Sequence, residues 1–474
     1  MTTMTWLSIL PSLLTIALAI WSKRIVPSLL AGLLLGGYLL DQRVTGGFET
    51  AVDQIVSTLT DKDSLQVLLF LYLFSGLIGI IKKSGGIQAF TALAANHVAS
   101  KNGVFYVLWA LIPVTFIDCG FRIVGAGSIT RPLAEKNGIA SARLAFMLNN
   151  TASPVVELIP IATTYVGFNV AIITLGLRSA GVGDVTSAYS IWLRAIPLEF
   201  FSLVVIAITF LSVFHTFRKE DKSLDAAAPH AAPAKTHLAM DATPSVIKPR
   251  ILNLVLPMLT VIGLSIFFFW FFGRAQSSDS SLAGAITSTE PNRAMLVALF
   301  ISMFLTAVFY AVQRYGLKEM IADIISGGNE IMPTLAILSV AWPLATVSQE
   351  LGMNVFIQNL VGTSLPVWSV AVALFILSAS VTYFIGSGWG SASLIMPFAI
   401  PLAVTVGASV PLCVAAVITG GTFGDVTSPV AGMTNMSSNI TRADQAEYLR
   451  YAAPYNFAAA GIAAILYVVA GLVG

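Results

Sequence analysis

The sequence predicts an all-α polytopic membrane protein, built from two inverted-topology repeats with broken helices and re-entrant hairpins. The first observation is composition: 56% of the residues are hydrophobic and 10% are charged, whereas a soluble domain carries about 25% charged residues. The second is the recurrence of long uncharged runs such as Ser64–Ile81, each long enough to cross a hydrocarbon core about 30 Å thick. The third is a set of short patterns that recur in both halves.

The first half begins with an apolar run, Trp6–Ile20, which no basic residue precedes and no small-residue cleavage signal follows. We therefore expect a retained span rather than a signal peptide. A second span follows the pair Lys23 and Arg24, and Ser64–Ile81 ends at Lys82 and Lys83. Because basic residues are enriched in cytoplasmic loops, these pairs place the N-terminus outside.

A change of composition divides the chain into residues 1–215, 216–250 and 251–474. The middle segment is charged and rich in Ala and Pro, so it cannot bury a core, and we expect a flexible cytoplasmic linker. The apolar pattern then restarts with spans at Ile251–Phe272 and Ala294–Tyr310. The first repeat thus starts outside and the second starts inside, which is the layout of inverted repeats.

Four local matches support this division, because they occur in the same order about 265 to 275 residues apart. Each pairs a segment of the first half with one of the second. They are Gly47–Val56 with Gly316–Ile325 (two amphipathic segments), Phe116–Gly120 with Phe384–Gly388, Arg131–Leu133 with Met396–Phe398, and Ser153–Val155 with Ser428–Val430. The Gly-rich and Ser-Pro matches interrupt apolar runs, and irregular backbone at membrane depth persists only inside protein or beside a water-filled cavity. We expect these breaks to meet at one site.

Few ionisable residues occur at membrane depth, and each is a functional candidate. Asp425 has no basic neighbour in its own segment, so it is the best candidate for a carrier of a proton or Na⁺. Asp118 precedes Arg122 by four residues, a spacing that allows an ion pair on a helix. Glu157 follows Pro154 by three residues, where it lies beside a break or faces water at a helix end.

Hydroxyl and amide side chains surround these acids. Such neutral ligands suit a partly dehydrated cation or a small polar solute, and they equally suit the satisfaction of broken helix ends. The candidates are Asn149, Asn150, Thr151, Ser153, Ser387, Thr427, Ser428 and Thr434.

The sequence contains no pattern typical of an enzyme. It has no Gly-rich phosphate loop, no Cys/His metal cluster and no nucleophile–base arrangement, and Cys119 and Cys413 lie in different apolar segments. We expect no cofactor, no metal site beyond transient Na⁺ at Asp425 and Asp118, and no nucleic-acid partner. The expected partners are the lipid bilayer, a small ion or polar solute, and a second copy in a homodimer.

These residues resemble the NhaC-type Na⁺/H⁺ antiporter family. The resemblance spans about Leu65–Phe214 and Ile331–Tyr455. The motifs that carry it are Phe116–Asp118 with Thr130–Pro132, Arg143–Ala145 with Thr151–Val155 and Pro160–Ile161, and Gly424–Asp425 with Ser428–Pro429. It implies a secondary transporter of the bacterial inner membrane, with Na⁺ or H⁺ as the coupling ion and alternating access between two inverted repeats.

The chain departs from the family pattern at four acidic or basic positions. Cys119, Asn149 and Gly432 stand where the family often has acids, and Val426 stands where it often has histidine, while Arg122 and Glu157 are added. Arg binds carboxylates bidentately, so an alternative is an ion-coupled exchanger of an organic anion or amino acid that is anchored by Arg122. A third reading, a channel or membrane scaffold, is disfavoured by the paired breaks.

Overall fold

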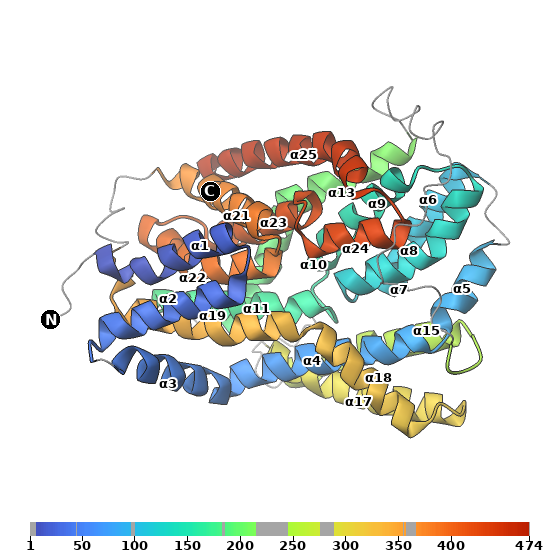
Figure 1. Cartoon of the computed structure of the whole chain (residues 1–474), viewed down its shortest axis with the longest axis horizontal. Coiled ribbons are helices and arrows are strands. Elements are labelled where there is room, and N and C mark those ends of the chain that lie inside the picture. The colour runs from blue at the N-terminus through green and yellow to red at the C-terminus, as the bar shows by residue number, and fades with distance from the viewer. Residues whose placement is uncertain are drawn as a thin grey trace.

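The computed structural model describes residues 6–43, 45–95, 100–182, 185–214, 245–274, 289–353, 355–356 and 366–473, and its helices account for nearly all of them, with no strand in these ranges. Most helices run along the long axis of the molecule, and the ends of the described chain lie toward the same side (Figure 1). The all-α prediction is confirmed. Most of the linker expected at 216–250 lies outside the described residues, so the division into three segments stays a prediction.

The helices of the first half alternate between long spans and short segments. Their bounds are η1 Trp6–Ser8, α1 Leu10–Ser22, α2 Ile25–Leu40, α3 Gly46–Thr60, α4 Lys62–Lys83, α5 Gly86–Ala95, α6 Lys101–Ala110, α7 Ile112–Thr115, α8 Cys119–Lys136, α9 Ser141–Asn150, α10 Ser153–Glu157, α11 Thr164–Ala180, α12 Val185–Ala195, η2 Ile196–Leu198 and α13 Phe200–Phe214.

The second half repeats this order with fewer interruptions. Its helices are α15 Leu252–Gly273, α17 Pro291–Val312, α18 Leu317–Glu330, α19 Met332–Glu350, α21 Val367–Ile385, α22 Gly388–Val406, α23 Val410–Thr427, α24 Gly432–Thr441 and α25 Gln445–Val473.

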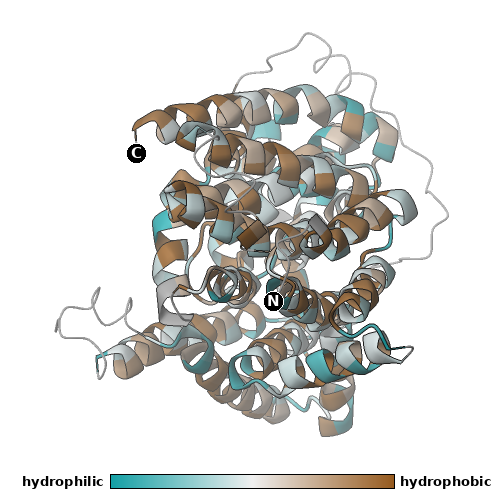
Figure 2. Ribbon diagram, turned by 90° about the vertical axis from the view of Figure 1, so that its left-hand side faces the viewer, coloured by the Kyte–Doolittle hydropathy of each residue, from teal (hydrophilic) through white to brown (hydrophobic). Residues whose placement is uncertain are grey.

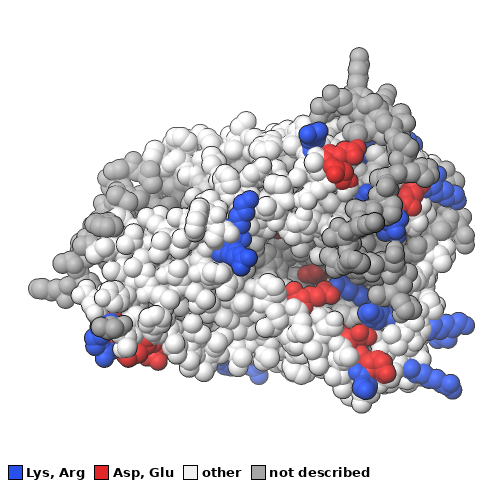
Figure 3. Space-filling model, viewed as in Figure 1, with Lys and Arg blue, Asp and Glu red and all other residues white. Residues whose placement is uncertain are grey.

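Seven of the described helical segments are long and apolar enough to cross a membrane, and two further bent pairs raise the number to nine. Apolar residues cover most helices, including those at the periphery (Figure 2). Charged side chains gather toward one end of the molecule and at one corner of the other, and the face between them is uncharged except for one basic group near its middle (Figure 3). This distribution is that of an integral membrane protein. The two predicted N-terminal spans form shorter helices, α1 of 13 residues and α2 of 16.

Reciprocal packing between the two halves shows the inverted repeat. Helix α1 packs on α2 as α15 packs on α17, and α3 packs on α19 as α18 packs on α4. Helix α2 contacts α19 as α17 contacts α4, and α8 contacts α24 as α22 contacts α11. The halves are therefore interleaved rather than separate, as the orange α19 beside the blue α2 and α4 illustrates in Figure 1.

The helix bounds define the register of the repeat. Equivalent helices start at nearly constant separation: α8 and α22 start 269 positions apart, at Cys119 and Gly388, and α11 and α24 start 268 apart, at Thr164 and Gly432. In this frame Pro429 is equivalent to Pro160, not to Pro154 as the sequence match indicates. The match to Pro154 is wrong by six positions because α9 carries an additional break at residues 151–152.

Each half places one helical hairpin and one broken helix around the centre of the molecule. The hairpins turn at residues 116–118, between α7 and α8, and at residues 386–387, between α21 and α22. The turns are shorter than the matched segments Phe116–Gly120 and Phe384–Gly388, because α8 already starts at Cys119 and α22 at Gly388. Gly386 adopts a left-handed φ of 80°, which glycine tolerates and other residues rarely do.

Candidate functional site

A central cavity of about 240 Å³ lies where the two hairpin turns meet the second broken helix. Asp118, Cys119 and Gly120 enter it from the first hairpin, and Gly386, Ser387 and Gly388 enter it from the second. Asp425 reaches it from α23. Three predicted site residues, Asp118, Ser387 and Asp425, therefore face one cavity although they are separated by up to 307 positions in sequence.

Asp118 caps the N-terminus of α8. Its Oδ1 accepts a hydrogen bond from the backbone N–H of Phe121 at 2.9 Å, and its Oδ2 accepts one from the Thr164 hydroxyl at 3.1 Å. Ser387 holds the equivalent position before α22, where its hydroxyl accepts from the Gly390 N–H at 3.1 Å. The positive end of a helix dipole stabilises a negative charge, and the first hairpin turn supplies that charge from its own cap residue, whereas the cap residue of the second turn is a neutral hydroxyl.

Asp425 lies in the last turn of α23, which ends at Thr427, and is 7% exposed. Its Oδ1 accepts a hydrogen bond from the Gly388 N–H at 2.9 Å, at the start of α22. The approach is possible because Gly388 has no side chain: a Cβ there would lie 2.8 Å from Asp425 Oδ2 and 3.0 Å from the Gly421 carbonyl. No described Lys, Arg or His forms an ion pair with Asp425.

A buried hydroxyl without a partner lies next to Asp425. Ser153 is fully buried, and its Oγ lies close to Asp425, Cys119 and Tyr165 without meeting the geometry of a regular hydrogen bond in the described part of the chain. Buried polar atoms are normally paired. An unpaired hydroxyl beside a carboxylate is therefore a ready oxygen ligand for a small cation or a water molecule.

Arg122 does not pair with Asp118 in the described structure. Its Nε donates to the Thr151 carbonyl at 2.5 Å, and its Nη2 donates to the Thr151 hydroxyl at 2.8 Å and the Leu108 carbonyl at 3.2 Å. Its Nη1 donates to the Thr115 hydroxyl at 2.9 Å. The guanidinium is fully buried, and it joins the first hairpin to the break between α9 and α10.

The amides predicted as ligands hold the two broken helices against α25. Asn149 donates to the Tyr448 hydroxyl at 2.7 Å, and Asn150 donates to Asn456 Oδ1 at 2.8 Å. Asn456 in turn donates to the Val426 carbonyl at 3.0 Å. The network thus satisfies backbone left unpaired by the break after α23.

The remaining predicted hydroxyls lie in the same region and outside the cavity lining. Thr434 donates to the Asp425 carbonyl at 3.1 Å, and Ser428 donates to the Tyr383 carbonyl at 2.6 Å. Thr427 is buried, and its hydroxyl has no partner among the described residues.

A second pair of buried acids lies behind Asp425. Glu157 accepts hydrogen bonds from the Ser202 and Thr422 hydroxyls, and Thr422 precedes Asp425 by about one turn of α23. Glu199 is also fully buried near Glu157, and neither of its carboxylate oxygens has a hydrogen-bond partner in the described ranges. Sequence analysis missed Glu199, although an acid inside an apolar run was the signal that identified Asp425.

A small cavity on the other side of Asp425 holds little more than a water molecule. Its volume is about 10 Å³, and Asn169, Thr422 and Asp425 line it together with Phe168 and Trp389. The Phe168 and Trp389 rings stack with centroids 4.4 Å apart. Trp389 also lines the central cavity, so its ring lies between the two spaces.

This fold and site define a class: a polytopic membrane protein in which hairpins and broken helices from two inverted halves bring carboxylates to a shared central cavity. A family model described as the Na⁺/H⁺ antiporter family matches residues 155–472, about two thirds of the chain. The chain belongs to that family and is a transporter.

Individual proteins extend the comparison to the whole length. An uncharacterized protein of Haemophilus influenzae is 26% identical and covers 98% of this chain and 90% of its own. The Alcanivorax borkumensis YdaH transporter, whose crystal structure is described as having an unusual topology, superposes with a TM-score of 0.58 at 16% identity, covering 97% and 98% of the two chains. Neisseria gonorrhoeae MtrF gives a TM-score of 0.47 at 15% identity, covering 91% and 85%.

The donor set fits a small hard cation or a proton better than a transition metal. Carboxylate and hydroxyl oxygens converge near Asp425, and such oxygens suit hard cations. No group of three or more His, Cys, Asp and Glu side chains placed to hold a metal occurs among the described residues.

Proposed function

We propose that this protein is an inner-membrane secondary active transporter that exchanges Na⁺ for protons by alternating access. Asp425 is the coupling carboxylate, and Asp118 is the second charged ligand. The observation that carries the proposal is that these two carboxylates, one from each repeat, face the same 240 Å³ cavity.

The surroundings of Asp425 support exchange at that residue. A buried carboxylate without a basic partner is costly in its charged form, so a proton or a cation stabilises it. Only one of its oxygens accepts a protein hydrogen bond that we observe, from Gly388. The unpaired Ser153 hydroxyl lies alongside, so the same place offers Na⁺ an oxygen ligand and offers a proton an acceptor.

The experiment uses purified protein in vesicles with an imposed pH gradient and a pH-sensitive dye. Addition of Na⁺ to the wild type is expected to dissipate the gradient, and Asp425→Asn is expected to abolish that response. Glu319→Gln, which removes an exposed acid from α18, is the matched control and should respond as the wild type does. An unchanged response in Asp425→Asn would reject the coupling role.

A second candidate substrate is a small organic solute, because 240 Å³ is more space than a single Na⁺ needs. The four hydrogen bonds of Arg122 to neutral oxygens argue against Arg122 as its anchor. The same vesicles receive a panel of amino and organic acids. A response to one of them without a response to Na⁺, Li⁺ or K⁺ would replace cation exchange with solute exchange. A current that does not saturate would indicate a channel.

A further inference from the structure

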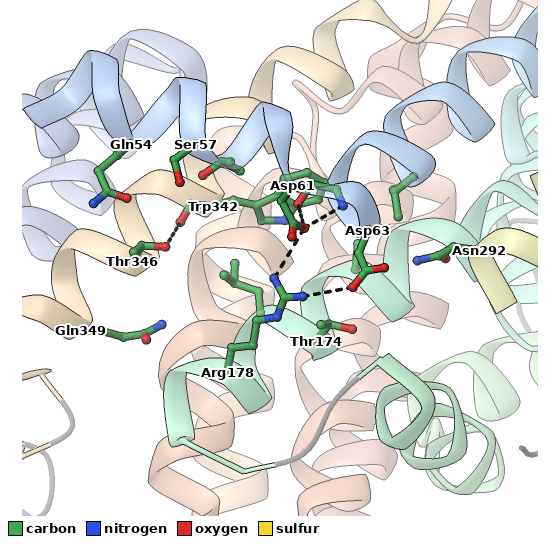
Figure 4. Close-up of a pocket in the computed structure, with 15 residues that line it drawn as sticks. Gln54, Ser57, Asp61, Asp63, Thr174, Arg178, Asn292, Trp342, Thr346 and Gln349 are labelled. Atoms are coloured by element: carbon green, nitrogen blue, oxygen red, sulfur yellow. Dashed lines mark hydrogen bonds and ion pairs between the residues drawn. The ribbon is translucent and has the colours of Figure 1, made fainter. Parts of the chain in front are cut away.

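A cavity larger than the central one lies away from Asp425, between α3, α4, α11, α17 and α19. Its volume is about 310 Å³, and most of its lining side chains are polar (Figure 4). Sequence analysis singled out none of them. By the positive-inside prediction, the start of α4 faces the outside, so this cavity lies at the external end of the molecule.

Two acids and one arginine set the charge of the cavity. Arg178 lies 3.1 Å from Asp63 and 3.6 Å from Asp61, and Figure 4 shows its guanidinium reaching between them. Glu290 and Lys62 also lie near Asp63, and their charges offset each other. The net charge of the cavity is therefore −1. Arg178 occupies the position at which a mobile cation would otherwise neutralise the two acids.

Asp61 is arranged to stay ionised. Asp61 Oδ2 accepts hydrogen bonds from the Ser64 N–H at 3.0 Å and the Ser64 hydroxyl at 2.9 Å. Partial burial raises the pKa of Asp61, but these bonds and the charge of Arg178 lower it further, so its pKa lies below the ordinary value of 3.8. The ion pairs are 35% to 48% exposed, and exposed pairs contribute roughly 0–1 kcal/mol to stability. They are therefore weak as structural links and easily exchanged.

Two buried polar atoms of the lining lack partners. Asn292 is 3% exposed and Trp342 is 5% exposed, and neither Asn292 Oδ1 nor Trp342 Nε1 has a hydrogen-bond partner within the described residues. Buried polar atoms in folded proteins are rarely left unpaired. An amide oxygen and an indole N–H in the same polar cavity suit a hydrated cation, the oxygen as a ligand and the N–H as a donor to its water.

Helix α11 connects this cavity to Asp425. Thr174 and Arg178 line the large cavity, and Phe168 and Asn169, one to two turns earlier, line the small cavity beside Asp425. Asn169 Nδ2 is also unpaired in the described part of the chain. The Phe168–Trp389 stack lies beside Asp425 on this route.

The repeat relates the large cavity to the central one. The large cavity adjoins the junction of α3 and α4, where Asp61 lies, and also α11. The central cavity adjoins the equivalent junction of α18 and α19, where Glu330 and Thr334 lie, and also α24. Asp61 and Glu330 are 269 positions apart and therefore equivalent, whereas the α11 side chains of the large cavity lie further along the helix than the equivalents of the α24 residues that line the central one. The two cavities therefore share an equivalent helix junction and lie along different stretches of the equivalent helices.

We propose that the cavity formed by Asp61, Asp63, Arg178 and Asn292 is a second cation-binding site, which supplies Na⁺ along α11 to Asp425 and in which Arg178 takes the place of the cation when none is bound. This inference rests on the proposed function for the route to Asp425, but the cavity's affinity for a cation is independent of transport.

The test relies on changes of opposite sign in the apparent KM for external Na⁺ when the acids or the arginine are replaced. In right-side-out membrane vesicles, Asp61→Asn/Asp63→Asn is expected to raise the apparent KM for external Na⁺ about tenfold, because clefts of one charge concentrate counter-ions by 10–10³-fold. Arg178→Gln, which leaves both acids unneutralised, is expected to lower it about threefold or more. The maximal rate should change less than about twofold in each. Asp53→Asn, an exposed acid on α3, is the control and should leave KM unchanged.

If the ion pair is purely structural, both variants should change the apparent KM in the same direction, because either replacement breaks the pair. That result would overturn the proposal. An unchanged KM in the double variant would also overturn it.

Binding of radioactive Na⁺ to purified protein separates this site from the coupling site. Asp425→Asn is expected to retain Na⁺ binding that Asp61→Asn/Asp63→Asn removes. That result supports the second site even if the vesicles show no Na⁺/H⁺ exchange. Na⁺ and Li⁺ binding that is indifferent to both acids would reject it, whatever Asp425→Asn does to transport.

Discussion

Replacement of Arg122 by glutamine distinguishes a structural arginine from a substrate anchor. The guanidinium makes four hydrogen bonds to neutral oxygens of Thr151, Thr115 and Leu108. Hydrogen bonds to charged groups contribute about 1.5–3 kcal/mol each. The two hydroxyls also donate to carbonyls of their own helices, so the main loss falls on the two carbonyl oxygens. We expect Arg122→Gln to lower the free energy of unfolding by about 3–5 kcal/mol.

The assay is denaturant unfolding in mixed micelles, followed by the affinity of any folded protein for its substrate. Arg131→Gln on the same helix is the control, because Arg131 is partly exposed and lies 3.8 Å from its acidic neighbour Glu135. It should cost less than about 1 kcal/mol. Arg122→Lys keeps the charge but loses the planar guanidinium group. Its loss in the free energy of unfolding should lie between those of Arg131→Gln and Arg122→Gln. Wild-type stability with lost affinity for an organic anion would refute this reasoning and restore Arg122 as an anchor.

Two further predictions concern the second hairpin. Gly386→Ala places a Cβ 2.6 Å from the Val430 carbonyl oxygen at a φ of 80°, so it should destabilise the protein by about 2–5 kcal/mol in thermal unfolding. The control is Gly263→Ala, which has open space around it and should not destabilise the protein in this way. Equal stability of the two variants would contradict the strained turn. Trp389→Ala removes the ring that stacks on Phe168, so vesicles should leak protons in the absence of Na⁺, and tight vesicles would show that this stack is not the barrier.

Much of the fold follows from hydropathy, because burial in lipid leaves few alternatives to apolar helices. The uncharged run Ser64–Ile81 lies within α4, and Ile251–Phe272 nearly coincides with α15. The order of the repeat was also predictable. Its register was not, because the Ser-Pro pair at residues 153–154 resembles the one at residues 428–429 more closely than Pro160 does.

The sequence predicted the candidate-site residues whose charge is costly to bury. It did not predict the contacts that depend on hydrogen-bond partners from distant segments. Asp118 and Asp425 were identified because a carboxylate at membrane depth is energetically costly and is therefore a functional candidate. Helical spacing suggested an ion pair of Asp118 with Arg122, but the carbonyls at the break near Thr151 compete for the guanidinium, and no local pattern shows that contact. The cavity between α3, α4 and α11 was missed because Asp61 and Asp63 lie at a helix start, where acids are ordinary caps.

The repeat accounts for the meeting of Asp118 and Asp425 at the central cavity. In the helix frame, Asp118 is equivalent to Ser387, and Asp425 is equivalent to Val156, 269 positions earlier. Each half therefore supplies one of these two carboxylates, and the twin position of each is uncharged. The helix arrangement is therefore symmetric, while the two charges are placed asymmetrically and lie where the halves meet. Because neither half alone contains both acids, a cation reaching the centre from either side would meet the same pair.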